Sequence, residues 1–223
     1  MDSLDKGPFR GEGKVKMTSV YILLTDTGTV LTRCIKLFTK KNYNHSSIAL
    51  DQQLDHVYSF GRKKVENPFD GGFVKENLYQ DFFLRANCQV YRFEVTDDQY
   101  ERLQNKLKEF ELEKAKYRYN LLGLIGIALH QHWERENAFF CSQFLAHVLI
   151  ECEMALFTKP AYLITPADLI DYLQPQLIYQ GRVYDYLAQR IVSTEAVAYE
   201  QPAHAFSIPG IKNLNIPVIN RFF

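Results

Sequence analysis

The sequence predicts an α+β domain in which an antiparallel sheet packs against helices. Two observations support this fold class. Strand-like and helix-like segments are mixed without the steady β-α-β alternation that a parallel sheet requires. The chain also has 223 residues, which suits one domain with a sizeable core. We expect one strongly apolar helix, late in the chain, to occupy the centre of this domain.

The predicted strands are short and rich in β-branched and aromatic residues. Segment 18–25 is apolar almost throughout, which indicates a central strand. Segments 45–50 and 56–61 follow as two strands joined by a short turn. Segment 87–95 alternates in polarity, and 176–183 is the last predicted strand.

The long segment 61–78 is interpreted as a loop, because it contains a proline and a Gly-Gly pair. A loop of this length inside a compact domain is often a lid or a substrate loop. Residues 1–17 are interpreted as a flexible N-terminal segment, and the domain is expected to cover 18–183. Beyond it, residues 184–223 are expected to form an extended tail that packs on the domain.

Three helices besides the central one follow from periodicity and capping signals. Segment 29–38 carries apolar residues at helical spacing. Thr96 opens a capping-box pattern, and the helix after it is expected to reach about residue 116. Thr165 is the predicted N-cap of a short helix that has Pro166 at its first position.

Composition argues against several classes of function. Lys+Arg and Asp+Glu both number 26, so no field of one sign recruits nucleic acid or an anionic membrane. No signal peptide is recognised, and the apolar run 120–129 is half of the roughly 20 residues that span a bilayer. We therefore expect a cytoplasmic protein without stable membrane insertion. The four cysteines form no C-x-x-C pair, so a zinc knuckle or a thioredoxin-like redox site is not expected. We expect no metal and no cofactor.

The central helix is predicted over residues 138–154, with Asn137 as its N-cap. Cys141 then lies in or just after the first helical turn. The positive field of a helix N-terminus stabilises a thiolate over a thiol. Cys141 is therefore a candidate nucleophile, although a free cysteine is also commonly a small apolar core residue.

A cysteine nucleophile needs a base and a group that orients the base. His147 lies in the same helix but points about 120° away from Cys141, so it is not a direct base. His130 and His132 lack further metal ligands at diagnostic spacing, and His204 lies in the tail. His45 begins a predicted strand, from which it could face the helix N-terminus or simply end a sheet edge.

Three segments together resemble a known superfamily. They are Asn44-His-Ser-Ser-Ile-Ala-Leu50, Val57-Tyr-Ser-Phe-Gly61 and Phe140-Cys-Ser-Gln-Phe144. Their order and flanking residues are similar to those of the circularly permuted papain-like, NlpC-type cysteine hydrolases. The similarity is to the YiiX-like and YycO-like branch, to which lecithin retinol acyltransferase is related. In that branch the histidine precedes the cysteine, as His45 precedes Cys141 here.

The resemblance implies a permuted papain-like fold over about 18–180 and assigns roles to residues. Cys141 matches the nucleophile and His45 the general base. Ser59 falls at the third position, but serine is a weak residue for orienting the histidine. His56, Glu66 and Glu76 therefore stay open as alternatives. Candidates for the oxyanion site or cleft are Tyr119 and Ser142, beside backbone N–H groups at the helix start.

The implied activity is a thiol-dependent hydrolase, an amidase or peptidase, that attacks an amide or ester carbonyl through an acyl-thioester. The substrate would be a small molecule, a peptide or an acyl compound. One alternative is a lipid-type acyltransferase or hydrolase on the same fold, and segment 120–129 could bring such an enzyme to a membrane. Another is a non-catalytic binding module whose third catalytic residue has degenerated.

Overall fold

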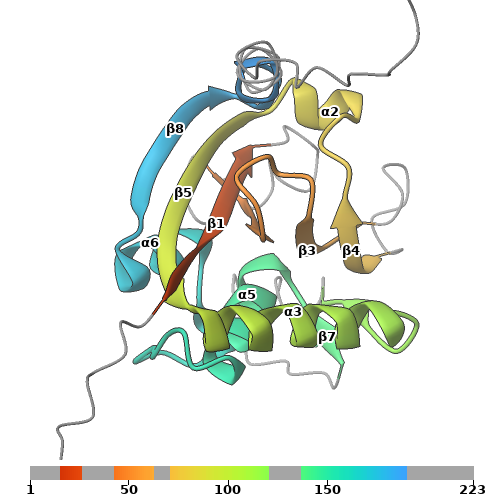
Figure 1. Ribbon diagram of the computed structural model, residues 1–223. Helices are drawn as coiled ribbons and strands as arrows, with labels where there is room; N and C mark the ends of the chain where they lie inside the picture. The colour runs from red at the N-terminus through yellow and green to blue at the C-terminus, as the bar shows by residue number, and fades with distance from the viewer. Residues whose placement is uncertain (1–15, 27–42, 63–70, 121–136, 190–223) are drawn as a thin grey trace, which may run out of the picture.

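A computed structural model describes residues 16–26, 43–62, 71–120 and 137–189. These residues form an α+β structure with a six-stranded antiparallel sheet of order β4-β3-β2-β1-β5-β8 (Figure 1). The strands of this sheet are β1 (Met17–Asp26), β2 (His45–Ala49), β3 (Val57–Arg62), β4 (Gly71–Glu76), β5 (Asn87–Thr96) and β8 (Gln176–Arg182). A separate parallel pair is formed by β6 (Arg118–Tyr119) and β7 (Ala138–Phe139).

Helices cover both faces of the sheet. The longer ones, α3 and α5, lie together on one side in Figure 1, and α2 lies near the opposite end of the strands. The helices of the described residues include α2 (Asp81–Leu84), α3 (Asp97–Leu112), α5 (Cys141–Glu151), the 3₁₀ turn η1 (Ala161–Leu163) and α6 (Pro166–Leu173). None of the helices in the described residues is long and apolar enough to cross a membrane.

Strand β1 is buried on both faces, as its continuous apolar run predicts. Val20 and Ile22 belong to the core shared with α3 and α5, whereas Tyr21 and Leu23 belong to the core on the other face. Side chains alternate across a strand, so a strand covered on both sides needs apolar residues at every position. The sequence-based expectation of a central strand at 18–25 is confirmed.

Aromatic packing fixes α5 against the sheet. The ring of Phe144 in α5 lies 4.9 Å from that of Phe60 in β3 and 5.1 Å from that of Phe110 in α3. Phe60 and Phe144 are fully buried, and such aromatic pairs add to the stability that burial alone provides. This cluster holds the helix that begins at Cys141 in one position relative to β2 and β3.

The start of α5 differs from the expected one. The helix begins at Cys141 rather than 138, and its N-cap is Phe140 in an extended conformation. Asn137 is not the N-cap: it adopts a left-handed φ of 54°, which asparagine tolerates in turns. The two residues after it, Ala138 and Phe139, pair with β6 instead of entering the helix.

Two other expectations need correction. The predicted loop 61–78 contains β4, which pairs with β3 over residues 71–76 despite its two glycines. Residues 183–189 are helical rather than extended, and their Tyr186 and Leu187 side chains are buried against the sheet. The predicted helix 29–38 and the rest of the tail lie outside the described residues.

Candidate active site

Cys141 meets the start of β2 at the N-terminus of α5. Its backbone begins the helix, and the residue is only 6 % exposed. The Cys141 Sγ atom lies 4.0 Å from the backbone oxygen of Asn44, the residue before β2. The thiol is therefore placed next to His45, the first residue of that strand.

His45 connects Cys141 to a carboxylate. Its ring lies close enough to the Cys141 side chain for each group to shift the pKa of the other. On its other side, His45 Nε2 lies 2.6 Å from Glu76 Oε1, at the end of β4. Cysteine, imidazole and carboxylate thus follow one another in the order that nucleophilic catalysis uses.

The strand geometry explains how His45 reaches both groups. The ladder between β2 and β3 consists of Ile48–Tyr58 and Ala49–Val57, and it does not continue to residues 45–47, all of which the structure describes. The start of β2 is therefore not tied to β3. Its histidine can lie between Cys141 at the start of α5 and the Glu76 side chain at the end of β4.

Glu76 is held as an ionised carboxylate. Its side chain is 4 % exposed, and burial by itself would raise its pKa. The charge of His45 and the hydrogen bonds from His45, Ser59 and Ser47 outweigh burial and lower the pKa of Glu76. The two serine hydroxyls donate over 2.6 and 2.7 Å, respectively. Charge-assisted bonds of this kind are short and strong.

The pKa shifts of His45 and Cys141 favour an ion pair. Burial opposes a charge on His45, but Glu76 and the neighbouring Cys141 raise the pKa of His45 from 6.5 to about 10. Burial would likewise raise the pKa of Cys141. The interaction with His45, the charge of His45 and the neighbouring Ser46 outweigh burial and lower it. The helix N-terminus favours the same thiolate.

The other described cysteines lack this environment. Burial raises the pKa of Cys88 to about 12, and Asp185 adds to the shift. Burial raises the pKa of Cys152 to about 11, although Lys106 and Arg102 oppose it. Cys141 is therefore the one thiol, among the three that the structure describes, whose surroundings favour the nucleophilic form.

Among the candidates for the third catalytic residue, the one that contacts His45 is not Ser59, the first choice from the sequence. Ser59 donates to Glu76 and not to His45, so the carboxylate stands between them. His56 is exposed and pairs with Asp51 over 3.0 Å, away from the thiol. Of the remaining alternatives, Glu76 contacts His45 directly, whereas Glu66 lies outside the described residues.

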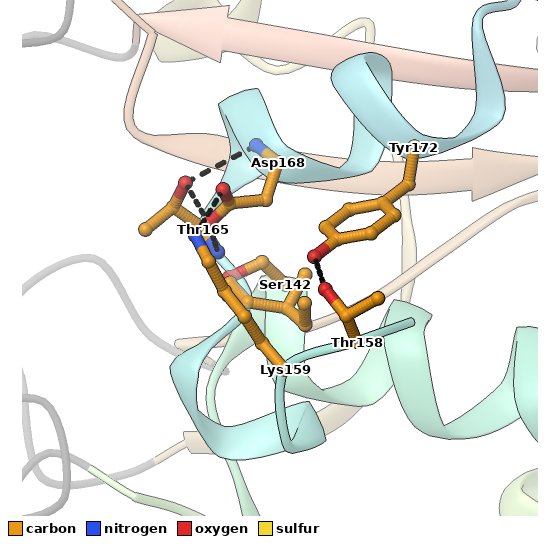
Figure 2. Close-up of polar contacts among 7 residues, drawn as sticks. Ser142, Thr158, Lys159, Thr165, Asp168 and Tyr172 are labelled. Carbon is orange, nitrogen blue, oxygen red and sulfur yellow. Dashed lines mark hydrogen bonds and ion pairs between the residues drawn. The ribbon is translucent and has the colours of Figure 1, made fainter. Parts of the chain in front are cut away.

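Ser142 has a structural role in this arrangement. Its hydroxyl is buried and donates over 2.6 Å to the backbone oxygen of Ile164, so it points toward the start of α6 rather than into the site (Figure 2). Thr165 and Asp168 cap that helix reciprocally, and Lys159 binds Asp168 over 2.7 Å. The predicted capping by Thr165 is confirmed, and the capped turn anchors the start of α5.

Tyr119 lies in β6, which packs against β4. It packs so closely on β4 that a Cβ atom at Gly71 would lie 2.6 Å from the Tyr119 Cβ. Because β6 pairs with β7, which directly precedes Phe140 and Cys141, this contact helps to place the start of α5. We therefore assign Tyr119 a part in the wall beside the site.

The remaining histidines do not approach the thiol in the described residues. The half-buried His147 packs against Phe110 and Phe139, and burial lowers its pKa. His130, His132 and His204 lie outside the described residues. Within the described part of the chain, no three His, Cys, Asp or Glu side chains are grouped as metal ligands would be.

Sequence reasoning missed Ser47 and Ser46. Ser47 follows His45 by two positions, and side chains two apart in a strand share a face. That spacing was a usable signal for a second hydroxyl beside the histidine. Ser46, between His45 and Ser47, helps to lower the pKa of Cys141.

Comparison with protein-family models, with curated proteins and with solved structures finds no match.

Proposed function

We propose that the protein is a thiol-dependent hydrolase with a permuted papain-like fold, acting on an amide or ester carbonyl. The observation that carries this proposal is the position of His45, which lies beside Cys141 and binds Glu76 over 2.6 Å. The chain order, histidine before carboxylate before cysteine, and the antiparallel sheet beside α5 agree with the resemblance described above.

In the proposed mechanism, the Cys141 thiolate attacks the carbonyl carbon and forms a C–S bond. His45, as the imidazolium, gives its proton to the leaving amine or alcohol as the C–N or C–O bond breaks. The products of this half-reaction are an acyl-thioester on Cys141 and a neutral His45. Water then loses a proton to His45, attacks the thioester and releases the carboxylic acid and the thiolate.

Glu76 stabilises the imidazolium and holds its ring in place during both steps. The first backbone N–H groups of a helix have no partner within the helix. Those at the start of α5 are therefore available to an oxyanion that forms beside Cys141. The same acyl-thioester is common to a hydrolase and an acyltransferase. They differ in whether water or another acceptor takes the acyl group.

The proposal is tested by looking for the covalent intermediate. The full chain is mixed with p-nitrophenyl acetate, and p-nitrophenol release is followed together with the intact mass. We expect a burst of one equivalent, and a mass gain of one acetyl group that peptide mapping places on Cys141. Cys141→Ala is expected to abolish both, and His45→Ala to slow the burst by about 100-fold or more.

The matched controls are Cys88→Ser and Cys152→Ser, which remove buried thiols outside the site. Both are expected to keep the burst. Acetylation spread over several cysteines and lysines, unaffected by Cys141→Ala, would leave the proposal without support.

A further inference from the structure

Both oxygens of the Glu76 carboxylate are bound by side chains from two other strands. Oε1 is bound by His45 Nε2 and by the Ser59 hydroxyl, each over 2.6 Å. Oε2 accepts from the Ser47 hydroxyl over 2.7 Å. The donors come from β2 and β3, and the acceptor comes from the end of β4.

Each serine hydroxyl has one proton to donate, and both protons go to Glu76. The Ser47 oxygen lies 3.4 Å from His45 Nε2, farther than from Glu76 Oε2, so the carboxylate is its better partner. Ser47 and Ser59 are both fully buried. No bulk water reaches these hydroxyls to compete for the bonds, and a buried hydroxyl without a partner would be costly.

Two hydroxyls on opposite oxygens fix the plane of the carboxylate. The terminal torsion of a glutamate is otherwise broad and roughly two-fold. With Ser47 on one oxygen and Ser59 on the other, Oε1 stays directed at His45 Nε2. The hydroxyls therefore control whether the carboxylate faces the imidazole, although neither of them touches the thiol.

We propose that Ser47 and Ser59 are positioning residues that act on Cys141 through Glu76 and His45. This inference rests on the proposed function, because it concerns the same site. Among the described residues, the titratable groups that act on His45 are Glu76 from β4 and Cys141 from α5. A change at the two serines is therefore expected to reach the thiol through the carboxylate and the imidazole.

The test is the pH dependence of Cys141 alkylation by iodoacetamide in the folded full chain, read by peptide mass spectrometry. Ser47→Ala or Ser59→Ala weakens the hold on Glu76, so the thiolate form of Cys141 should need a higher pH. We expect the rate at about pH 6 to fall about threefold in each single variant and about tenfold in the double variant.

Conservative and control variants separate positioning from a general loss of structure. Ser47→Thr and Ser59→Thr keep the hydroxyl and are expected to keep the wild-type profile. Ser19→Ala also removes a serine–glutamate bond between neighbouring strands, that to Glu94 over 2.9 Å, but far from the site. It should leave the profile unchanged. Thermal unfolding identifies the variants that fold.

The outcomes distinguish this inference from the proposed function. A profile unchanged in the serine variants but shifted in Glu76→Gln would overturn the inference and leave the Cys-His-Glu site standing. An equal shift in Ser19→Ala would also overturn it. No shift in either Glu76→Gln or His45→Ala would remove the proposed function together with the inference.

Discussion

His45 Nε2 and Glu76 Oε1 lie 2.6 Å apart although 31 residues separate them in the chain. Both side chains are nearly buried, with exposed fractions of 14 % and 4 %. A carboxylate and an imidazole so enclosed stabilise each other's charged forms, because little water competes with their attraction. The consequence is an imidazolium beside Cys141, where a neutral histidine would otherwise be expected at neutral pH.

Replacing Glu76 by alanine should strongly destabilise the fold. It removes one partner of a buried ion pair and leaves His45, Ser47 and Ser59 without their acceptor. Such a change typically costs about 3–5 kcal/mol of the free energy of unfolding. Urea denaturation followed by circular dichroism measures it, and a loss below about 1 kcal/mol would contradict the buried pair.

The stability that this pair provides should depend on pH in a defined window. The lowered pKa of Glu76 contributes stability above its ordinary value of 4.5, and this is lost as pH falls through the folded pKa. The raised pKa of His45 contributes fully below 6.5 and is lost as pH rises toward about 10. The difference between wild type and Glu76→Gln should thus be greatest between about pH 5 and about pH 6.5.

That comparison uses urea unfolding of both proteins at several pH values. A difference in the free energy of unfolding that is flat from acid to alkaline pH would show that the two groups are not coupled in the folded state.

Gly71→Ala should disturb the wall of the site. The new Cβ would lie 2.6 Å from Tyr119 Cβ and 2.8 Å from the backbone oxygen of Gly61, which is too close without movement of β6 or β3. Overpacking of this kind typically costs about 1–3 kcal/mol. Because β6 holds β7 next to Cys141, the p-nitrophenyl acetate burst should also slow.

Gly61→Ala is the matched control for this prediction. A Cβ there would meet its nearest neighbours at 3.5–3.8 Å, which is ordinary van der Waals contact. Its melting temperature should stay near that of the wild type. Equal melting temperatures for the two alanine variants would mean that the close approach of β6 to β4 is not real.

Ser142→Ala tests whether this serine is an anchor or part of the chemistry. Loss of its buried bond to the Ile164 oxygen should lower the free energy of unfolding by about 1–3 kcal/mol. The rate of the ester burst should stay within about twofold, because the hydroxyl does not face the site. A large drop in burst rate without a change in stability would instead favour the oxyanion role.

Much of the sheet could be predicted from local pattern, and the misses have identifiable causes. β1 was recognisable because burial on both faces demands an unbroken apolar run. β4 was not, because Gly71 and Gly72 read as loop residues. The structure places a glycine at 71 because the Tyr119 side chain leaves no room for a Cβ. Such a requirement comes from a tertiary contact and leaves no local signal.

For the candidate site, the sequence pointed to Cys141 and His45 but not to the residue that contacts His45. Cys141 and His45 were identified by helix and strand position together with the resemblance. The third group stayed open because residues from two strands had to be placed side by side, and strand register cannot be read from one sequence. The pairing of β4 with β3 places Glu76 on the same face of the sheet as Ser59. From the sequence alone, Ser59 was the first choice for the partner of His45, because it lies on the strand that follows.

The pH dependence of thiol alkylation in the folded chain, with and without His45, tests the ion pair most directly. We predict that iodoacetamide modifies Cys141 well below its ordinary pKa of 9.0. Cys88 and Cys152, with pKa values raised to about 12 and about 11, should stay unmodified under the same conditions. His45→Ala should move Cys141 alkylation to higher pH. If Cys141 reacts only above pH 9 in the wild type, or if His45→Ala changes nothing, no thiolate–imidazolium pair exists there.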